Sequence, residues 1–169
     1  MASHESIAFW GPNNLKRWPK AYVEDLRIAN SSKQFLAHVG LPCNENWTLR
    51  FDCDAESLPR LARRPSFRRF GFDGAVPICL DEDFNGRVVA DETEINGEER
   101  MINSSVEHFG EFLVLYQQYR HSARIMSEDQ VLALIPRIER RMREIDPDAL
   151  HDPSSYWPLI LEQMKQGLL

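Results

Sequence analysis

The residues of this chain whose types and spacing most suggest chemistry lie between Asp81 and Glu92. Asp81, Asp83 and Asn85 alternate with other residues, Gly86 follows directly, and Glu92 comes after five more positions. This is the spacing at which an EF-hand loop presents oxygen ligands to Ca²⁺. An EF-hand loop joins two helices, however, and here the flanking segments have the composition of strands. We therefore expect no metal ion at this loop, and a Ca²⁺-induced rise in melting temperature of several degrees would reverse that expectation.

The rest of the sequence offers little to a catalytic site. It contains no G-x-S-x-G, H-E-x-x-H, Walker or G-x-G-x-x-G motif. His108 and Glu111 are spaced for one helix face, which is typical of a surface contact, and Ser104 and Ser105 are placed to cap a helix. We predict no catalytic residue and no cofactor. A hydrolase remains an alternative that requires a deep pocket where His108, His121 and a carboxylate converge.

Negative charge is concentrated in one short stretch, which holds eight carboxylates and a single basic residue, Arg87. We call these carboxylates the acidic rim: Asp81, Glu82, Asp83, Asp91, Glu92, Glu94, Glu98 and Glu99. One interpretation is a solvated edge that discourages strands of different molecules from pairing. The other is a surface that attracts a basic partner over a long range.

A group of arginines precedes the acidic rim: Arg60, Arg63, Arg64, Arg68 and Arg69. These arginines could pair with part of the rim or could bind an anion, and the sequence leaves both interpretations open. The net charge of the whole chain is −6. That charge disfavours nucleic acid as the main partner, because phosphate backbones attract Lys and Arg.

A predicted meander positions the acidic rim. Asn85-Gly86 and Asn96-Gly97 separate three short runs of apolar and β-branched residues, and Asn-Gly pairs favour tight hairpin turns. After the third run, Ser104 and Glu107 have the spacing of a capping box. We predict three antiparallel strands that lead directly into an amphipathic helix over 105–121.

Two further helices are predicted near the C-terminus. Ser127 and Gln130 form a second capping box, and the helix that follows contains Pro136, which predicts a kink or a break. The last helix is predicted to begin with Asp152 as its cap before a proline and to end at Gly167.

Strands are also predicted before the meander. Period-two alternation indicates a strand over 46–52 and, less cleanly, another over 67–72, with an irregular or briefly helical connection over 56–65. Strands thus dominate the middle of the chain and helices dominate its end. This order predicts an α+β fold with a largely antiparallel central sheet, mixed pairing left open, and helices packed on one side.

The chain has 169 residues, and we divide it into an N-terminal arm, 1–25, and a single domain, 26–169. Trp10 and Trp18 in the arm are interpreted as packing residues. The sequence shows no apolar run near the ~20 residues that span a bilayer and no signal-peptide pattern, so we expect a cytoplasmic protein without membrane contact.

The three cysteines, Cys43, Cys53 and Cys79, are an odd number without C-x-x-C spacing. We expect all three to be reduced thiols, with Cys79 facing the core from its strand.

Several short segments share an order and a spacing that suggest a family. They are Phe35-Leu36-x-x-x-Gly40-Leu41-Pro42, Gly71-Phe72-Asp73, Ile78-x-Leu80-Asp81 with Gly86-x-Val88, Ile102-Asn103-Ser104-Ser105-x₃-Phe109, Tyr156-Trp157-Pro158 and Gly167-Leu168. Together they resemble the SUKH superfamily, the Smi/Knr-like proteins, and in particular its fourth bacterial subgroup. The resemblance covers the chain from about Leu26 onward and does not explain the N-terminal arm.

The resemblance implies a single α+β domain and a non-enzymatic role as an immunity protein that binds and blocks a cognate polymorphic toxin, often a nuclease or a deaminase. It implies structural roles for the matching residues, so the contact site is our own inference from charge. We predict contacts with a basic toxin surface at Asp83, Phe84, Glu92, Glu94, Glu98 and Glu99. The alternative is a ligand-sensing or scaffolding domain without a toxin, and the oligomeric state stays open.

Overall fold

The computed structural model describes residues 2–43, 49–93, 95 and 97–168. Its N-terminal part contains α1 (Ala2–Trp10), a short 3₁₀ helix η1 (Pro12–Asn14), β1 (Leu15–Lys16), α2 (Lys20–Glu24), α3 (Asn30–His38) and β2 (Leu41–Pro42). The middle contains β3 (Leu49–Phe51), β4 (Arg60–Leu61), β5 (Arg64–Asp73), β6 (Val76–Asp81), η2 (Glu82–Phe84), β7 (Arg87–Asp91) and β8 (Glu99–Asn103). The C-terminal part contains α4 (Val106–Ala123), α5 (Glu128–Ile145), η3 (Asp148–Leu150) and α6 (Tyr156–Lys165).

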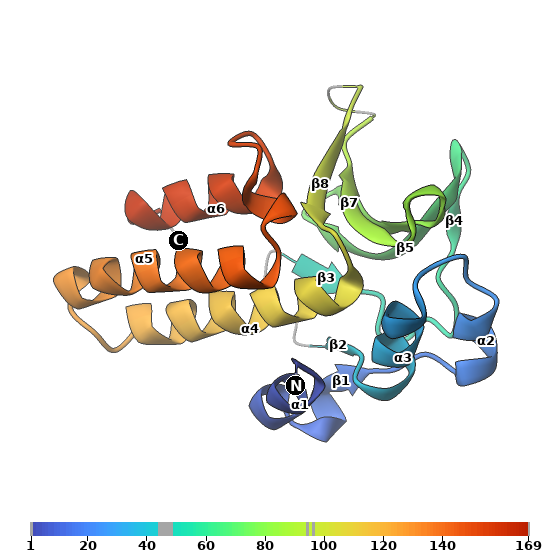
Figure 1. Cartoon of the computed structure of the whole chain (residues 1–169), viewed down its shortest axis with the longest axis horizontal. Coiled ribbons are helices and arrows are strands. Elements are labelled where there is room, and N and C mark those ends of the chain that lie inside the picture. The colour runs from blue at the N-terminus through green and yellow to red at the C-terminus, as the bar shows by residue number, and fades with distance from the viewer. Residues whose placement is uncertain (1, 44–48, 94, 96, 169) are drawn as a thin grey trace.

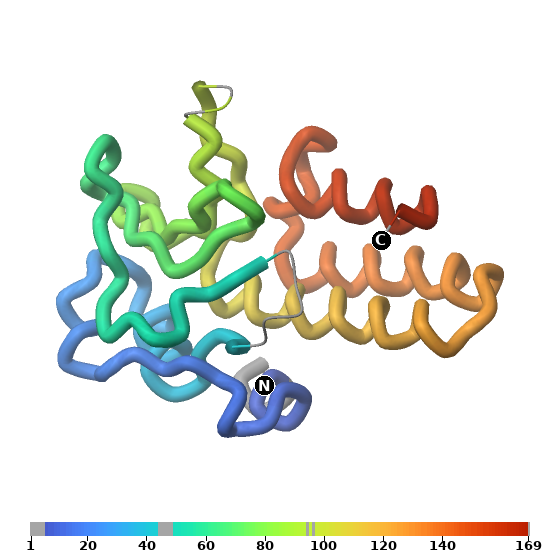
Figure 2. The backbone as a smooth tube through the Cα atoms, turned by 180° about the vertical axis from the view of Figure 1, so that it is seen from behind, coloured from blue at the N-terminus to red at the C-terminus, as the bar shows by residue number. Residues whose placement is uncertain are grey.

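The main sheet has the order β3-β5-β6-β7-β8, with β4 paired to β5, and β1 and β2 form a separate two-stranded sheet. Every pair described is antiparallel. Figure 1 shows α4, α5 and α6 lying alongside one another next to this sheet. From behind, the sheet and the three C-terminal helices lie side by side, with the N-terminal elements along their lower side (Figure 2). The predicted α+β fold with an antiparallel sheet is confirmed.

The strands before the meander agree with the sequence in position. The predicted strand over 67–72 lies within β5, and β4 is a short strand inside the connection expected to be irregular. Of the strand predicted over 46–52, residues 49–51 form β3, while 46–48 lie outside the described residues.

The core lies between the sheet and α4. Alternate strand residues such as Phe70 and Leu80 are completely buried on this face. The ring of Phe70 lies 5.8 Å from that of Phe109 on α4, centroid to centroid, and Phe112 lies 5.3 Å from Trp157 on α6. These edge-on aromatic contacts join the sheet, α4 and α6 into one packed unit.

The opposite face of the sheet is shielded differently. Phe67, Cys79 and Val89 form a small buried cluster of their own. The Arg64 guanidinium lies 4.9 Å from the centroid of the Phe67 ring. Long charged side chains can cover apolar surface with their aliphatic stems while their ends remain in water, and this face uses them in that way.

The N-cap of α4 lies one residue later than the capping-box pattern in the sequence indicated. Ser105, not Ser104, is the N-cap of α4, because its hydroxyl accepts a hydrogen bond from the His108 backbone N–H at 3.3 Å. The Ser104–Glu107 capping box is therefore wrong: the Glu107 carboxylate instead accepts a hydrogen bond from the Ser32 hydroxyl on α3, at 2.7 Å.

For α5 and α6, one predicted helix start is confirmed, while a predicted break and a second predicted start are wrong. The capping box of Ser127 and Gln130 is confirmed. A break at Pro136 is wrong, because α5 continues through it, and the burial of Ile135 and Met142 on one face gives packing that compensates for the lost backbone bond. The expected start at Asp152 is also wrong, since its carboxylate closes a turn by accepting the Ser154 N–H, at 2.8 Å, and α6 begins only after Ser155.

The residues before Leu26 belong to the same core as the rest of the chain. Trp10 is 7% exposed and Trp18 is 2% exposed, and both join the main cluster. β1 pairs with β2, with Leu15 opposite Pro42. The packing role expected for the two tryptophans is confirmed.

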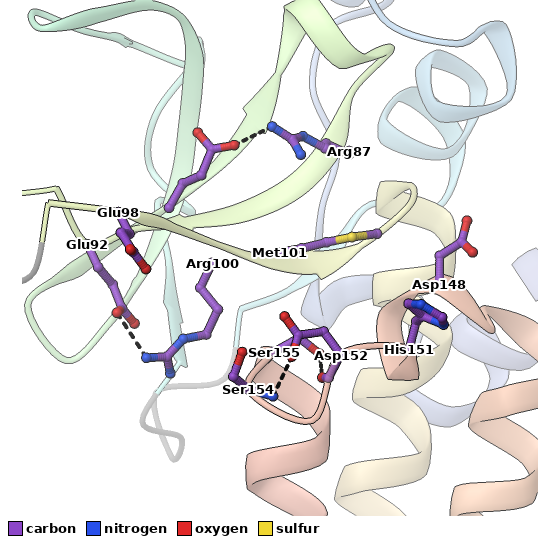
Figure 3. A pocket seen from close by; sticks show the side chains of 11 residues that line it. Arg87, Glu92, Glu98, Arg100, Met101, Asp148, His151, Asp152, Ser154 and Ser155 are labelled. Carbon is purple, nitrogen blue, oxygen red and sulfur yellow. Dashed lines mark hydrogen bonds and ion pairs between the residues drawn. The ribbon is translucent and has the colours of Figure 1, made fainter.

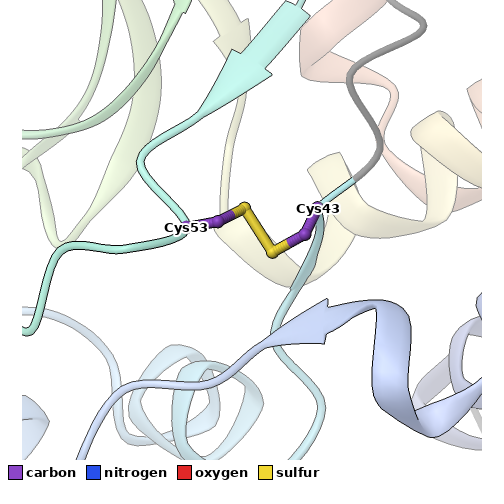
Figure 4. Close-up of a disulfide and its surroundings, with 2 residues drawn as sticks. All are labelled: Cys43 and Cys53. Carbon is purple, nitrogen blue, oxygen red and sulfur yellow. A yellow bond between two sulfur atoms is a disulfide. The ribbon is translucent and has the colours of Figure 1, made fainter.

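The cysteines require a correction. Cys43, just after β2, and Cys53, just after β3, are joined by a disulfide with a Cα–Cα distance of 5.8 Å (Figure 4). The expectation of reduced thiols is wrong for these two, because the fold brings together two segments whose ten-residue separation has no recognisable spacing. Cys79 is free and buried as expected, and burial raises the pKa of its thiol.

Candidate partner-binding site

The structure separates the acidic rim into two groups at opposite ends of β7. Asp83 and Phe84 lie in the turn between β6 and β7, while Glu92 follows β7, Glu98 directly precedes β8 and Glu99 is the first residue of β8. Glu94 lies outside the described residues. The carboxylates expected to form an acidic rim therefore do not make one surface, because successive turns of an antiparallel meander lie at opposite ends of its strands.

In the first group the carboxylates are held by arginines. Asp81 is 2% exposed, and its carboxylate accepts hydrogen bonds from Arg87 at 2.9 and 3.1 Å. Glu82 accepts the Arg27 backbone N–H at 3.1 Å, and its buried carboxylate lies within 3.3 Å of Arg60 and Arg68. These contacts tie the β6–β7 turn to the segment before α3, through Arg27, and to β4 and β5, through Arg60 and Arg68.

The ends of this turn are more exposed. Asp83 is paired with Arg27 at 3.2 Å on the surface. The ring of Phe84 is 61% exposed, with the Arg87 guanidinium 4.0 Å from its centroid. The EF-hand spacing thus falls on a strand–turn–strand unit, as expected from its flanks, and its three acidic positions, Asp81, Asp83 and Glu92, are all engaged by arginine.

The second group is also partly neutralised. Glu99 forms ion pairs with Arg64 and Arg87, and Glu92 with Arg100 at 2.9 Å. Of the two interpretations of the arginine group, pairing with the rim is confirmed for Arg60, Arg64 and Arg68. Arg69 pairs with Asp52 at 3.1 Å instead.

The second group borders a groove of about 580 Å³ between the β7–β8 hairpin and the loop that precedes α6. Figure 3 shows the strand residues on one wall and the loop residues on the other. The groove is lined by Arg87, Glu92, Glu98, Glu99, Arg100, Met101, Asp148, His151, Asp152, Ser154 and Ser155. Five of these side chains are carboxylates and two are guanidinium groups, so the groove has an excess of negative charge.

The loop wall was not found from the sequence. Asp148, His151 and Asp152 were not assigned to a site, and Asp152 was interpreted only as a helix cap. The available signal was the composition of 146–155, which is rich in Asp, Pro and Ser and precedes a strongly apolar helix. Such a segment is typical of an exposed loop held by the helix behind it.

A buried polar network fixes this loop wall relative to the sheet. The Trp157 indole N–H donates to Asn103 at 2.8 Å, and the Asn103 amide donates to Asp146 at 2.9 Å. The Ser104 backbone N–H also donates to Asp146, at 2.8 Å. Nearby, the Tyr156 hydroxyl donates to Asp73 on β5 at 3.0 Å.

The network affects protonation. Burial by itself would raise the pKa of Asp146, but the nearby His108 ring and hydrogen bonds from Asn103 and Ser104 outweigh it and lower that pKa to about 2. The nearby Asp146 carboxylate raises the pKa of His108, although partial burial opposes the change. Asn103, Tyr156 and Trp157 belong to the segments that carry the resemblance, and their contacts here are structural.

The structure also bears on the other sequence hypotheses. His108 lies in the first turn of α4 and His121 in its last, about 20 Å apart along the helix at 1.5 Å per residue. They do not converge on one pocket.

Among the described side chains, no three of His, Cys, Asp and Glu are grouped as metal ligands. Within the described part of the chain, none of the helices has the length and apolar character needed to span a bilayer.

Fold and site define an α+β protein in which a charged antiparallel sheet and a helical layer enclose an acidic surface groove. The comparison with family models then identifies the group: the chain belongs to the SUKH-4 immunity protein family, whose model matches residues 4–163. The resemblance noted from the sequence is confirmed, and family membership gives the chain an immunity-type function against a toxin. No curated protein and no solved structure matched the chain.

Proposed function

We propose that this protein neutralises a cognate toxin, such as a nuclease or a deaminase, by binding a basic surface of it at the acidic groove. The observation that carries the proposal is the charge of the groove, which is lined by five carboxylates and only two guanidinium groups. Enzymes that act on nucleic acid carry basic clefts because they hold phosphate backbones. An acidic surface seated on such a cleft excludes the substrate without covalent chemistry.

The predicted contacts fit this proposal to different degrees. Glu92, Glu98 and Glu99 line the groove, whereas Asp83 and Phe84 lie at the far end of β7. We place the main contact at the groove, and extend it with Asp148 and Asp152 on the loop wall. Exposed Phe84 remains a candidate for a second, apolar contact.

A charge-reversal experiment tests the groove. The variant Glu98→Lys with Asp148→Lys changes one exposed carboxylate on each wall. Its control, Asp25→Lys with Glu56→Lys, makes the same change in net charge at two exposed positions outside the groove. The binding partner to be tested is the product of the gene beside this chain's gene, inactivated in its active site if it is a toxin.

We expect the groove variant to associate with the toxin at least tenfold more slowly, and with a weaker dependence on salt, because local charge steers association. The control should change the rate less than threefold in stopped-flow measurements. If both variants behave alike, net charge alone matters and the groove is not the contact. A neighbouring gene product that is no toxin and does not bind would favour the ligand-sensing alternative.

A further inference from the structure

The groove runs beside one edge of β8, for which the described residues supply no partner strand. Within the part of the chain that the structure describes, β8 is the last strand of the main sheet and pairs only with β7, through Val89 with Met101, Ala90 with Arg100 and Asp91 with Glu99. Among the described residues, no backbone hydrogen bond outside this pairing reaches 99–103. In an antiparallel pair, alternate residues direct their N–H and C=O groups away from the partner. β8 therefore presents unpaired backbone groups on its other side.

Only one half of this edge is open. At the C-terminal end of β8, Asn103 is bonded to Trp157 and Asp146, which closes the sheet against α6. At the N-terminal end, Glu99, Arg100 and Met101 all line the groove. The open edge is thus three residues long, about 10 Å at the rise of a strand, and it forms one side of a preformed cavity.

Charge identifies the occupant of the groove. A second copy of this chain would place its own acidic groove against this one, and like charges facing each other oppose that pairing. A segment with Lys or Arg at alternate positions would instead direct its basic side chains toward Glu98 on one wall and Asp152 on the other. Its backbone would meanwhile satisfy the open edge of β8.

We propose that the toxin docks by adding an extended, basic segment as a further strand on residues 99–101 of β8. This inference rests on the proposed function and specifies how the same groove recognises its partner. Main-chain hydrogen bonds to β8 contribute affinity, and the acidic walls select basic side chains at every second position. Arg100 is held by Glu92 and Glu99 by Arg64 and Arg87, so the charged residues of β8 itself are already engaged.

Amide hydrogen exchange tests the added strand. The labelled protein is measured by NMR alone and in complex with the inactivated toxin encoded beside its gene. We expect at least one amide among 99–101 to exchange tenfold or more slowly in the complex. The internal control is β3, the strand at the opposite end of the sheet, whose amides should be unchanged.

A pair of proline variants tests the same edge. Because successive strand residues direct their N–H groups to opposite sides, one of Arg100→Pro and Met101→Pro removes a bond to β7 and the other removes a groove-facing donor. The variant that keeps its folded stability should lose at least tenfold in affinity for the toxin.

The outcomes separate this inference from the proposed function. A complex that forms with no change in exchange at 99–101 overturns the added strand and leaves toxin binding at the groove intact. Protection of β3 instead, or a self-associated dimer in sedimentation, also overturns it. If no complex forms with the toxin, both the proposed function and the added strand are wrong. If neither proline variant folds, the hydrogen-exchange measurement by itself tests the added strand.

Discussion

At the scale of single residues, Asp146 is a buried carboxylate that is held by several parts of the chain. It is 1% exposed and accepts hydrogen bonds from the Asn103 side chain and the Ser104 backbone. His108 approaches it to 3.7 Å. These contacts join the end of β8, the start of α4 and the end of α5, so one carboxylate positions the loop wall of the groove.

The pKa of Asp146 leads to a prediction about acid stability. Its pKa falls from 3.8 to about 2 on folding. A lowered folded-state pKa gives stabilisation that is fully present above the unfolded value and is lost as pH falls from about 4 toward 2. At 1.36 kcal/mol per pKa unit, we expect the advantage of the wild type over Asp146→Asn to be about 1.5 kcal/mol larger at pH 5 than at pH 2.5. Urea unfolding at the two pH values measures it.

The contrary result is simple to recognise. An advantage of the wild type that stays constant between pH 5 and pH 2.5 would mean that the Asp146 carboxylate is not preferentially ionised in the folded protein.

At the scale of elements, the β6–β7 turn is fixed by its contact with the segment before α3. Asn85 and Gly86 have φ angles of 56° and 86°, as their sequence predicts. The turn is longer than a two-residue hairpin, however, because η2 lies between the strands. The Asn85 carbonyl accepts the Ala29 N–H at 3.3 Å, and Gly86 lies against Ile28.

Two glycine substitutions separate the cost of backbone conformation from the cost of packing. A Cβ at Gly86 would lie 2.7 Å from Ile28 Cβ, whereas one at Gly97 would meet no atom within 4 Å, and both glycines have positive φ. We expect Gly97→Ala to cost about 1 kcal/mol, from φ alone. Gly86→Ala should cost about 3 kcal/mol, because overpacking is added. Chemical denaturation measures both, and equal losses would contradict the close contact with Ile28.

At the scale of the whole molecule, the Cys43–Cys53 disulfide connects the N-terminal part to the central sheet. Cys43 follows β2 and its backbone N–H donates to the Asn14 carbonyl at 2.8 Å. Cys53 follows β3, whose partner is β5. The disulfide therefore restrains the path by which the chain passes from the small sheet into the large one.

Loop closure predicts what the disulfide contributes. A cross-link that closes a loop of ten residues stabilises a protein by about 3 kcal/mol. For a chain of this size, that corresponds to a melting temperature about 6–12 °C lower in the variant Cys43→Ser with Cys53→Ser. Wild-type protein treated with a phosphine reductant should show the same decrease, with two additional thiols open to alkylation. An unchanged melting temperature after reduction would contradict the prediction.

The sequence by itself determined the features that depend on local physics. Asn-Gly pairs favour a left-handed backbone, alternating apolar residues favour a sheet with one buried face, and the capping box of Ser127 and Gln130 marks a helix start. These signals involve residues a few positions apart, so they established the meander, the helical end and the α+β class. The ordered segments that resemble SUKH proteins established the family.

Tertiary structure decided everything that depends on distant residues meeting. It divided the acidic rim between two ends of β7, paired Glu82 with Arg60 and Arg68, joined Cys43 to Cys53 and brought Glu98 and Asp148 to the walls of one groove. No local rule encodes such pairings, because each arises only when packing of the helices against the sheet brings separate segments together.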